Sequence, residues 1–338
     1  MLEAVRGRFR GLDRALRRTA KRSRRVRYLY QRALGVRQRA YLGVAGARDR
    51  LAGGRVGEAA GGVNPERIVW IFCTSRSGST WLRQMLEDLT GGKVWEEPKV
   101  GQLFGNFYEK AQKEQRQSRN FVFGEPARRG WTGSIRSFVL DGVRYVHPFI
   151  GPAQYLIVKE PDGAVGAPLL MEALPESRMI LLVRDPRDVA ASAFDATRRG
   201  NWMYEAADDA ERQNRLARKR PEEFARGRAR AYVRQVSNAK RAYDSHGGSK
   251  ALIRYEDLKA DTLGVMRRAC SALEIPFEEE ELFRVVRKHS WENVPRQEKG
   301  EGKFYRKATP GGWREDLTPE QVKIIEDVTG PLLKELYP

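Results

Sequence analysis

Short, continuous apolar runs that alternate with helical segments constrain the fold of this chain most strongly. Four such runs are expected to form strands: Arg67–Cys73, Tyr155–Val158, Arg178–Val183 and Lys250–Tyr255. Uninterrupted apolar runs of this length are typical of parallel strands that are buried on both faces. Helical periodicity is found in Thr80–Leu89, Leu169–Leu174, Val189–Phe194, Glu205–Ser245, Asp261–Leu273 and Thr318–Leu336, and an interruption of Glu205–Ser245 is expected near Pro221. The pattern predicts an α/β fold, in which a P-loop-like parallel sheet is flanked by helices on both faces.

The positive charge of the chain is concentrated at its N-terminus. Residues 1–55 hold 17 Arg or Lys side chains against three acidic ones, so they supply +14 of the net charge of +19. Apolar residues recur there every three or four positions, which predicts a basic helical arm. A Gly-rich segment, Gly53–Val63, follows. We therefore expect a basic arm with its linker at residues 1–63 and one folded domain at residues 64–338.

Three interpretations of the basic arm remain open: contact with an anionic membrane, packing on its own domain, or nucleic-acid binding. Nucleic acid is not expected as a partner, because no known base-reading motif is found in the arm. The chain has only two cysteines, and no apolar stretch reaches the length of a membrane span. We expect a cytoplasmic protein, for which peripheral contact of the arm with the inner face of the membrane and packing of the arm on its own domain are equally compatible.

A Ser/Gly-rich loop, Ser75–Thr80, lies between the first predicted strand and the first predicted helix. Backbone N–H groups at the start of a helix point at one spot, and the helix dipole favours an anion there. Gly78 allows close approach of the backbone to a ligand, Ser79 and Thr80 add hydroxyl donors, and Arg76 adds a forked cation suited to phosphate. The loop predicts a phosphate site, although a loop capped by Ser and Gly for structural reasons would look similar.

The loop departs from the Walker A pattern, since both its first glycine and its lysine are missing. We also find no acidic residue at a strand end that would hold magnesium, so no metal is expected. These departures disfavour a P-loop kinase-like phosphotransferase, which remains an alternative. A non-catalytic nucleic-acid-binding protein is the other alternative.

Four segments resemble motifs of the PAPS-dependent sulfotransferase superfamily. Ser75-Arg76-Ser77-Gly78-Ser79-Thr80-Trp81 is similar to the family loop P-K-S-G-T-T-W, with arginine for lysine as in carbohydrate sulfotransferases. Arg184 and Ser192 keep the eight-residue spacing of the family's 3′-phosphate site. Tyr255–Lys259 resembles the family's Y-E-D-L/M-K, and Arg306–Trp313 resembles R-K-G-x-x-G-D-W, with Ala308 and Gly312 as departures.

The resemblance implies a set of donor-binding residues, with PAPS as co-substrate and PAP as product. Ser75, Arg76, Ser77, Gly78, Ser79 and Thr80 would hold the 5′-phosphosulfate. Trp81 and Tyr255 would lie at the adenine. Arg184, Ser192, Arg306 and Lys307 would bind the 3′-phosphate.

The resemblance also frames the search for the catalytic base. The family's catalytic histidine position is occupied here by Pro161, which points to a bacterial member closer to the carbohydrate-type branch that uses a glutamate. Glu97 and Glu96 are the candidates, with Glu97 slightly preferred, although an acidic turn without a catalytic role is equally compatible. Glu160 is a weaker third candidate. Lys159 and Arg76 would stabilise the leaving group.

The acceptor is the least constrained part of the expected reaction. Aromatic residues are frequent in Phe104–Ile150, and aromatic walls suit a sugar face, a phenol or a lipid. With the basic arm, a saccharide or glycolipid hydroxyl is the preferred acceptor, and another small molecule remains open.

Overall fold

The computed structural model describes residues 62–115, 120–197, 210–300, 303, 307 and 309–337, without the side chains of 112–115 and 210–212. Five parallel strands form one sheet in the order β2-β3-β1-β4-β5. The strands are β1 (Ile68–Phe72), β2 (Lys93–Glu96), β3 (Leu156–Glu160), β4 (Arg178–Val183) and β5 (Lys250–Arg254). The predicted parallel α/β fold is confirmed.

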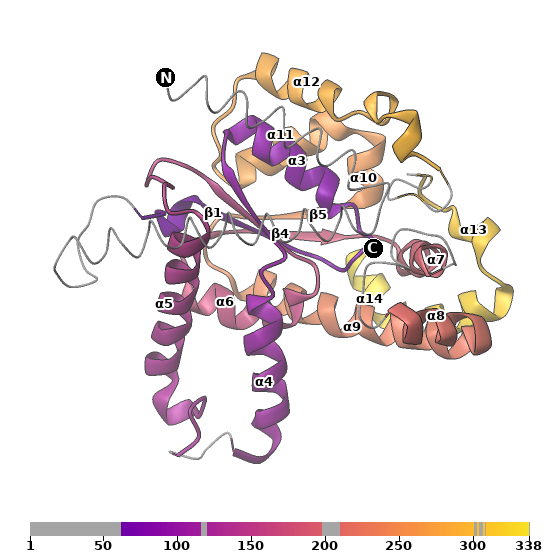
Figure 1. The fold of residues 1–338 in the computed structure, drawn as a ribbon, viewed down its shortest axis with the longest axis horizontal. Coiled ribbons are helices and arrows are strands. Elements are labelled where there is room, and N and C mark those ends of the chain that lie inside the picture. The colour runs from indigo at the N-terminus through magenta and orange to yellow at the C-terminus, as the bar shows by residue number, and fades with distance from the viewer. Residues whose placement is uncertain are drawn as a thin grey trace, which may run out of the picture. The chain divides into compact units, whose positions relative to one another are not determined.

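Helices cover both faces of the sheet (Figure 1). On one face lie α3 (Ser79–Thr90), α10 (Tyr255–Ala260), α11 (Thr262–Ala272) and α12 (Glu279–Lys288). On the other lie α4 (Val100–Gln115), α5 (Arg128–Val146), α6 (Ala167–Ala173), α9 (Pro221–Ser245) and α14 (Pro319–Leu336). At one end of the sheet are α7 (Pro186–Ala196), α8 (Ala210–Lys219) and α13 (Trp313–Asp316).

The central strand β1 shows why its apolar run is unbroken. Ile68, Trp70 and Phe72 enter the core under α5, α6 and α9, whereas Val69 and Ile71 enter the core under α3 and α11. All five side chains are fully buried. Alternate residues of a strand point to opposite faces, so a strand covered on both faces needs apolar residues at every position.

One strand was not predicted. Strand β2 is an edge strand of only four residues, and its side chains are half-buried or exposed. Its sequence, Lys-Val-Trp-Glu, therefore has no continuous apolar run, and only pairing with β3 defines it. Strand β3 also extends two residues further than expected, so Lys159 and Glu160 lie within the strand.

The predicted helical stretch Glu205–Ser245 is interrupted at Pro221 as expected, because α8 ends at Lys219 and α9 begins at Pro221. Proline suits the first helical position, since it lacks the N–H that would otherwise be unpaired. The C-terminal helix begins as predicted at the Thr318 cap, where Thr318 and Gln321 form a reciprocal capping box.

The basic arm and nearly all of its linker lie outside the described residues. Cys73 and Cys270 are buried free thiols. Among the helices that the structure describes, none combines the length and the apolar character needed to cross a bilayer.

Candidate functional site

Each of the five strands delivers a predicted site residue to the same edge of the sheet. The strands are parallel, so their carboxyl ends meet there, and ligands of open α/β sheets bind at this edge. The Ser75–Thr80 loop follows β1, Glu96 ends β2 and Glu97 follows it, and Lys159 lies near the end of β3. Arg184 follows β4, and Tyr255 follows β5. Residues up to 180 positions apart in the sequence are therefore brought to one edge of the sheet.

The Ser75–Thr80 loop makes a sharp turn into α3. Arg76 and Gly78 both have positive φ angles, 73° and 88°. Gly78 is the N-cap of α3 and offers no side chain to the first turn, so N–H groups there are available to an anion. The buried Ser77 hydroxyl donates to the carbonyl of Thr74 at 2.7 Å and thereby fixes the turn.

Two arginines and a serine from the predicted anion sites are in direct contact. Arg76 Nε donates to Ser192 Oγ at 2.9 Å, and Arg184 Nη1 donates to the carbonyl of Arg76 at 3.0 Å. The Arg184 guanidinium lies 4.2 Å from the centre of the Tyr255 ring, and its buried Nε has no hydrogen-bond partner. The two predicted sites for phosphate therefore form one continuous cationic surface.

A second cluster joins the loop to the two candidate bases. Lys159 Nζ lies 2.6 Å from Glu96 Oε1 and 2.9 Å from Glu97 Oε1, and it donates to Thr80 Oγ1 at 3.3 Å. Burial lowers the pKa of Lys159, but the hydrogen bonds that its ammonium donates to Glu96 and Glu97 outweigh burial and raise the pKa above its ordinary value. The Lys159 ammonium is therefore charged and lies between the Ser75–Thr80 loop and both carboxylates.

The two carboxylates differ in their surroundings. Glu96 also pairs with Arg83, at 3.4 Å from its Nε. Glu97 has a positive φ of 50°, an uncommon conformation for a residue other than glycine, and its N–H continues the ladder by donating to the Lys159 carbonyl at 2.9 Å. Strained residues of this kind are concentrated at functional sites, which favours Glu97 of the two.

Glu160 is fully buried and serves the fold. Its Oε1 accepts the N–H of Val100 at 3.1 Å, at the start of α4, and its other oxygen lies against Gly163. Burial raises the pKa of Glu160 to about 7, against the opposing hydrogen bonds from Val100 and Lys99. Such a carboxyl caps α4 rather than facing an acceptor.

Glu160 predicts a specific pH dependence of stability. Its folded-state pKa of about 7 exceeds the ordinary 4.5, so the folded state binds the proton more tightly. The stabilisation is complete below about pH 4.5 and is lost as the pH rises towards 7, at most about 3 kcal/mol in all. We expect Glu160→Gln to become progressively more stable than wild type from pH 5 to 8 in urea titrations. Glu176→Gln is the control: Arg136 lowers the pKa of Glu176, so this variant should be less stable than wild type by an amount that stays constant from pH 5 to 8 and shrinks only below about pH 4.5. A difference between Glu160→Gln and wild type that does not change with pH would contradict the assignment.

Aromatic side chains line the site beside the loop. Trp81 and Tyr255 meet edge to face with centroids 6.3 Å apart, and Trp81 Nε1 donates to the carbonyl of His289 at 2.8 Å. Lys259 Nζ lies 5.9 Å from the ring centres of both Trp81 and Trp291. Sequence reasoning missed Trp291, which only the tertiary structure brings to this wall.

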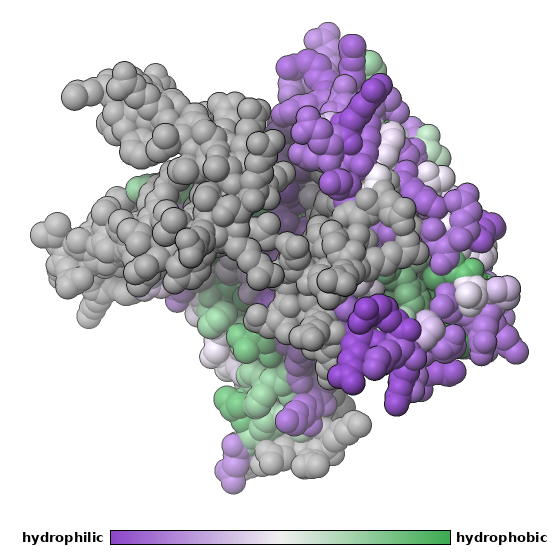
Figure 2. Space-filling model, turned by 45° about the vertical axis from the view of Figure 1, so that its right-hand side comes forward, coloured by the Kyte–Doolittle hydropathy of each residue, from purple (hydrophilic) through white to green (hydrophobic). Residues whose placement is uncertain are grey.

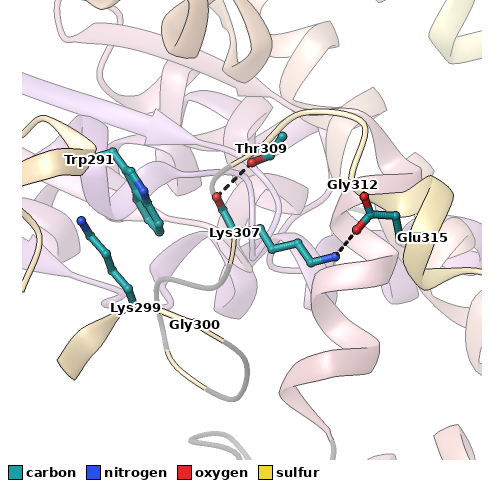
Figure 3. Close-up of a pocket in the computed structure, with 7 residues that line it drawn as sticks. All are labelled: Trp291, Lys299, Gly300, Lys307, Thr309, Gly312 and Glu315. Atoms are coloured by element: carbon teal, nitrogen blue, oxygen red, sulfur yellow. Dashed lines mark hydrogen bonds and ion pairs between the residues drawn. The ribbon is translucent and has the colours of Figure 1, made fainter. Parts of the chain in front are cut away.

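A pocket of about 390 Å³ lies next to Trp291 (Figure 3). Lys299 lies over the Trp291 ring at 4.8 Å, and Lys307 extends along the opposite side. Lys307 is paired with Glu315 at 2.7 Å and with Asp316 at 3.1 Å in this structure. Arg306, predicted to act beside Lys307, lies outside the described residues.

Asp188 is a further residue that sequence reasoning left without a functional role. Its two carboxylate oxygens accept the N–H groups of Gly311 at 2.8 Å and Trp313 at 3.0 Å. Its Oδ2 also lies 3.9 Å from Arg184 Nη2. The available signal in the sequence was an acidic residue four positions after Arg184, at the start of a predicted helix. Asp188 fixes the segment that follows Lys307 to the helix that carries Ser192.

Comparison with known proteins agrees with this geometry. The family described as sulfotransferase domain matches residues 66–337. The chain belongs to the sulfotransferase family. This match confirms the predicted family and enzyme class. A search of curated proteins found no match to the sequence.

Solved structures of sulfotransferases share the fold. A mouse sulfotransferase, SULT7A1, complexed with PAP, is 14% identical with a TM-score of 0.50, covering 80% of this chain and 85% of its own. Sulfotransferase STF9 from Mycobacterium avium is also 14% identical with a TM-score of 0.50, covering 81% and 77%. At this identity the likeness shows the fold alone, and it agrees with the parallel sheet.

Proposed function

We propose that this sulfotransferase moves a sulfuryl group from PAPS to an acceptor hydroxyl and releases PAP. The observation that carries the proposal is that the two clusters are joined. Ser192 and Arg184 contact Arg76 of the loop. Thr80, at the other end of the loop, contacts Lys159, which pairs with both glutamates. The PAP complex of the mouse neighbour supports the choice of donor.

Donor binding follows from the charges and ring faces. The loop Ser75, Arg76, Ser77, Gly78, Ser79 and Thr80 binds the 5′-phosphosulfate, and Arg184 with Ser192 binds the 3′-phosphate. The adenine stacks on the wall formed by Trp81, Tyr255 and Trp291. Arg306 and Lys307 complete the 3′-phosphate contact, for which Lys307 exchanges its carboxylate partners for phosphate.

The transfer step is an in-line displacement at sulfur. The acceptor oxygen attacks sulfur as Glu97 takes the hydroxyl proton, and the bond from sulfur to the 5′-phosphate oxygen breaks. Lys159 and Arg76 stabilise the negative charge that develops on the departing phosphate. Lys159 contacts both the base and the loop, so it links the two halves of the reaction.

The preferred acceptor is a saccharide or glycolipid hydroxyl, with other small molecules as the alternative. The site offers ring faces, and the glutamate base places the chain nearer the carbohydrate-type branch. The basic arm at residues 1–63, which precedes the catalytic domain at 64–338, contacts an anionic membrane surface peripherally. Such contact would bring the enzyme to a lipid-borne acceptor.

A thermal melt tests the donor. PAP without magnesium is expected to raise the melting temperature, because a ligand that binds only the folded state stabilises it by mass action. ATP with magnesium is the comparison. Stabilisation by ATP–Mg alone would favour the kinase-like alternative, and steeply salt-dependent DNA binding with no PAP effect would favour the nucleic-acid alternative.

Gly78 provides a prediction about the shape of the loop. A β-carbon there would lie 2.5 Å from Tyr255 Cδ2, and the φ of +88° already disfavours a side chain. Gly78→Ala should therefore lower stability by about 1 kcal/mol or more and weaken PAP binding at least about tenfold. Gly91→Ala is the control: its φ is +60°, but nothing lies within 4 Å of the added carbon. Equal PAP affinity in the two variants, measured by calorimetry, would refute the contact with Tyr255 as a determinant of donor binding.

A further inference from the structure

Exposed apolar side chains gather on one element of the fold. The element is the helical hairpin, residues 100–150, which comprises α4, α5 and the segments that follow each of them. Of the eight large apolar residues exposed in the described part of the chain, seven lie on this hairpin: Leu103, Phe107, Val122, Phe138, Tyr145, Val146 and Phe149. The eighth, Phe283, lies on α12, across the sheet (Figure 1). Single exposed apolar residues are ordinary, but a gathered set marks an interaction surface.

The helical hairpin extends away from the sheet (Figure 1), and apolar residues gather on its surface (Figure 2). Ring contacts between its segments order it from within. The rings of Phe104 and Phe138 meet edge to face at 5.3 Å, and Phe107 meets Phe123 at 5.3 Å. Trp131 Nε1 donates to the carbonyl of Gly124 at 3.1 Å. The exposed side chains are therefore carried on a packed scaffold.

The apolar surface begins beside the candidate active site. Leu103 lies in the first turn of α4 and is 54% exposed. That turn is held by Glu160, which binds the Val100 N–H, and it starts three residues after Glu97. A partner that binds along the hairpin would therefore lie next to the carboxyl edge of the sheet, where the proposed reaction takes place.

Charge distinguishes the possible occupants of this surface. The hairpin carries eight Arg or Lys and four Asp or Glu. The described domain begins at Gly62, where a β-carbon would lie 3.3 Å from Arg144 Nε of α5, and residues 1–55, earlier in the sequence, carry +14. Positive charge on the hairpin, together with its exposed apolar side chains, matches anionic lipid headgroups over acyl chains. A second copy of a chain with a net charge of +19 would bring like charges together.

We propose that the helical hairpin inserts its exposed apolar side chains into the surface of an anionic lipid bilayer. The proposal rests on the peripheral membrane contact proposed above and assigns its apolar part to the hairpin. The basic arm supplies the electrostatic attraction. The site edge beside Leu103 then faces hydroxyl groups at the level of the lipid headgroups.

Vesicle co-sedimentation of the full chain tests the proposal, with phosphatidylglycerol vesicles compared with phosphatidylcholine vesicles. The test variant is Leu103→Gln with Tyr145→Gln, which removes two exposed apolar side chains and keeps helix-forming residues. Phe283→Gln is the matched control, because Phe283 and Leu103 are both 54% exposed. Wild type and Phe283→Gln should bind phosphatidylglycerol vesicles more strongly than phosphatidylcholine vesicles. The double variant should bind phosphatidylglycerol vesicles at least about tenfold more weakly.

Added salt separates the electrostatic contribution of the arm from the apolar contribution of the hairpin. Salt screens the charges of the arm, whereas the difference in vesicle binding between wild type and the double variant should persist. Val122→Gln, in a turn at 63% exposure, is the second test variant if the double variant does not fold. Stabilisation by PAP is measured on every variant, so that failure of the donor site is distinguished from failure of the hairpin. Equal vesicle binding by wild type and the hairpin variants overturns the proposal. So does a wild-type dimer, seen by sedimentation without lipid, that the hairpin substitutions dissociate.

Discussion

Replacing Glu97 with glutamine is expected to lower kcat by about 10²- to 10⁴-fold, the range over which a positioned general base contributes. Glutamine keeps the size and the hydrogen-bonding capacity of the side chain but cannot accept the acceptor's proton. The affinity for PAP should change by less than about threefold, because Glu97 contacts Lys159 rather than the loop or the arginines. The measurement is transfer from labelled PAPS to an acceptor identified by screening cell extracts, with PAP binding followed separately by calorimetry.

Glu96→Gln is the matched control for this experiment. Glu96 contacts the same ammonium but also pairs with Arg83, and it lies on the exposed edge strand. We expect a smaller loss of kcat, from weaker positioning of Lys159. If Glu96→Gln abolishes turnover while Glu97→Gln does not, the roles of the two carboxylates are reversed. Full activity in both variants would remove the base from this segment altogether.

The second large effect is expected at Arg184, whose replacement by alanine should weaken PAP binding about 10- to 100-fold. Hydrogen bonds to charged groups contribute about 1.5–3 kcal/mol each, and Arg184 is nearly buried, which limits screening by solvent. The same substitution removes the hydrogen bond to the Arg76 carbonyl and the packing on Tyr255, so the loop is also less well held. Calorimetric titration with PAP gives the affinity directly.

Arg187→Ala provides the comparison from the same turn. Arg187 pairs with Asp185 and Glu326 and covers Trp313, so it already has its partners within the protein. Its loss should change PAP affinity by no more than about threefold. Arg184→Lys should lie between, because lysine keeps the charge but not the planar fork of donors. Equal affinities of the Arg184→Ala and Arg187→Ala variants would mean that Arg184 does not bind the nucleotide.

Regular signals in the sequence were sufficient for the sheet and for the place of the Ser75–Thr80 loop between β1 and α3. Strands β1, β3, β4 and β5 are apolar at most or all positions because helices cover both of their faces, so each was visible as a run. The Ser75–Thr80 loop could be predicted because a Ser/Gly-rich segment between a predicted strand and a predicted helix is expected to form a turn at the helix N-terminus. The spacing of Arg184 and Ser192 was visible because both belong to one local unit, the end of β4 and the second turn of α7.

Weaker local signals were less informative. Strand β2 lacks an apolar run because its side chains are half-buried or exposed at the edge of the sheet. The aromatic residues of Phe104–Ile150 are divided between the interior and the exposed surface of the helical hairpin, and their role in an acceptor pocket stays a prediction. Composition gives the presence of aromatic rings, whereas their exposure depends on which helix face meets the rest of the protein.

The sequence by itself determined the sulfotransferase family, the parallel α/β architecture and the strand-to-helix loop Ser75–Thr80, since these depend on local periodicity and on contiguous motifs. Only the tertiary structure decided that Lys159 lies between Thr80 and two glutamates, that Asp188 holds the segment at Gly311 and Trp313, and that Trp291 joins the aromatic wall. These contacts join residues separated by 32 to 125 positions along the chain. Their pairing is fixed by strand order and register, which no local pattern specifies.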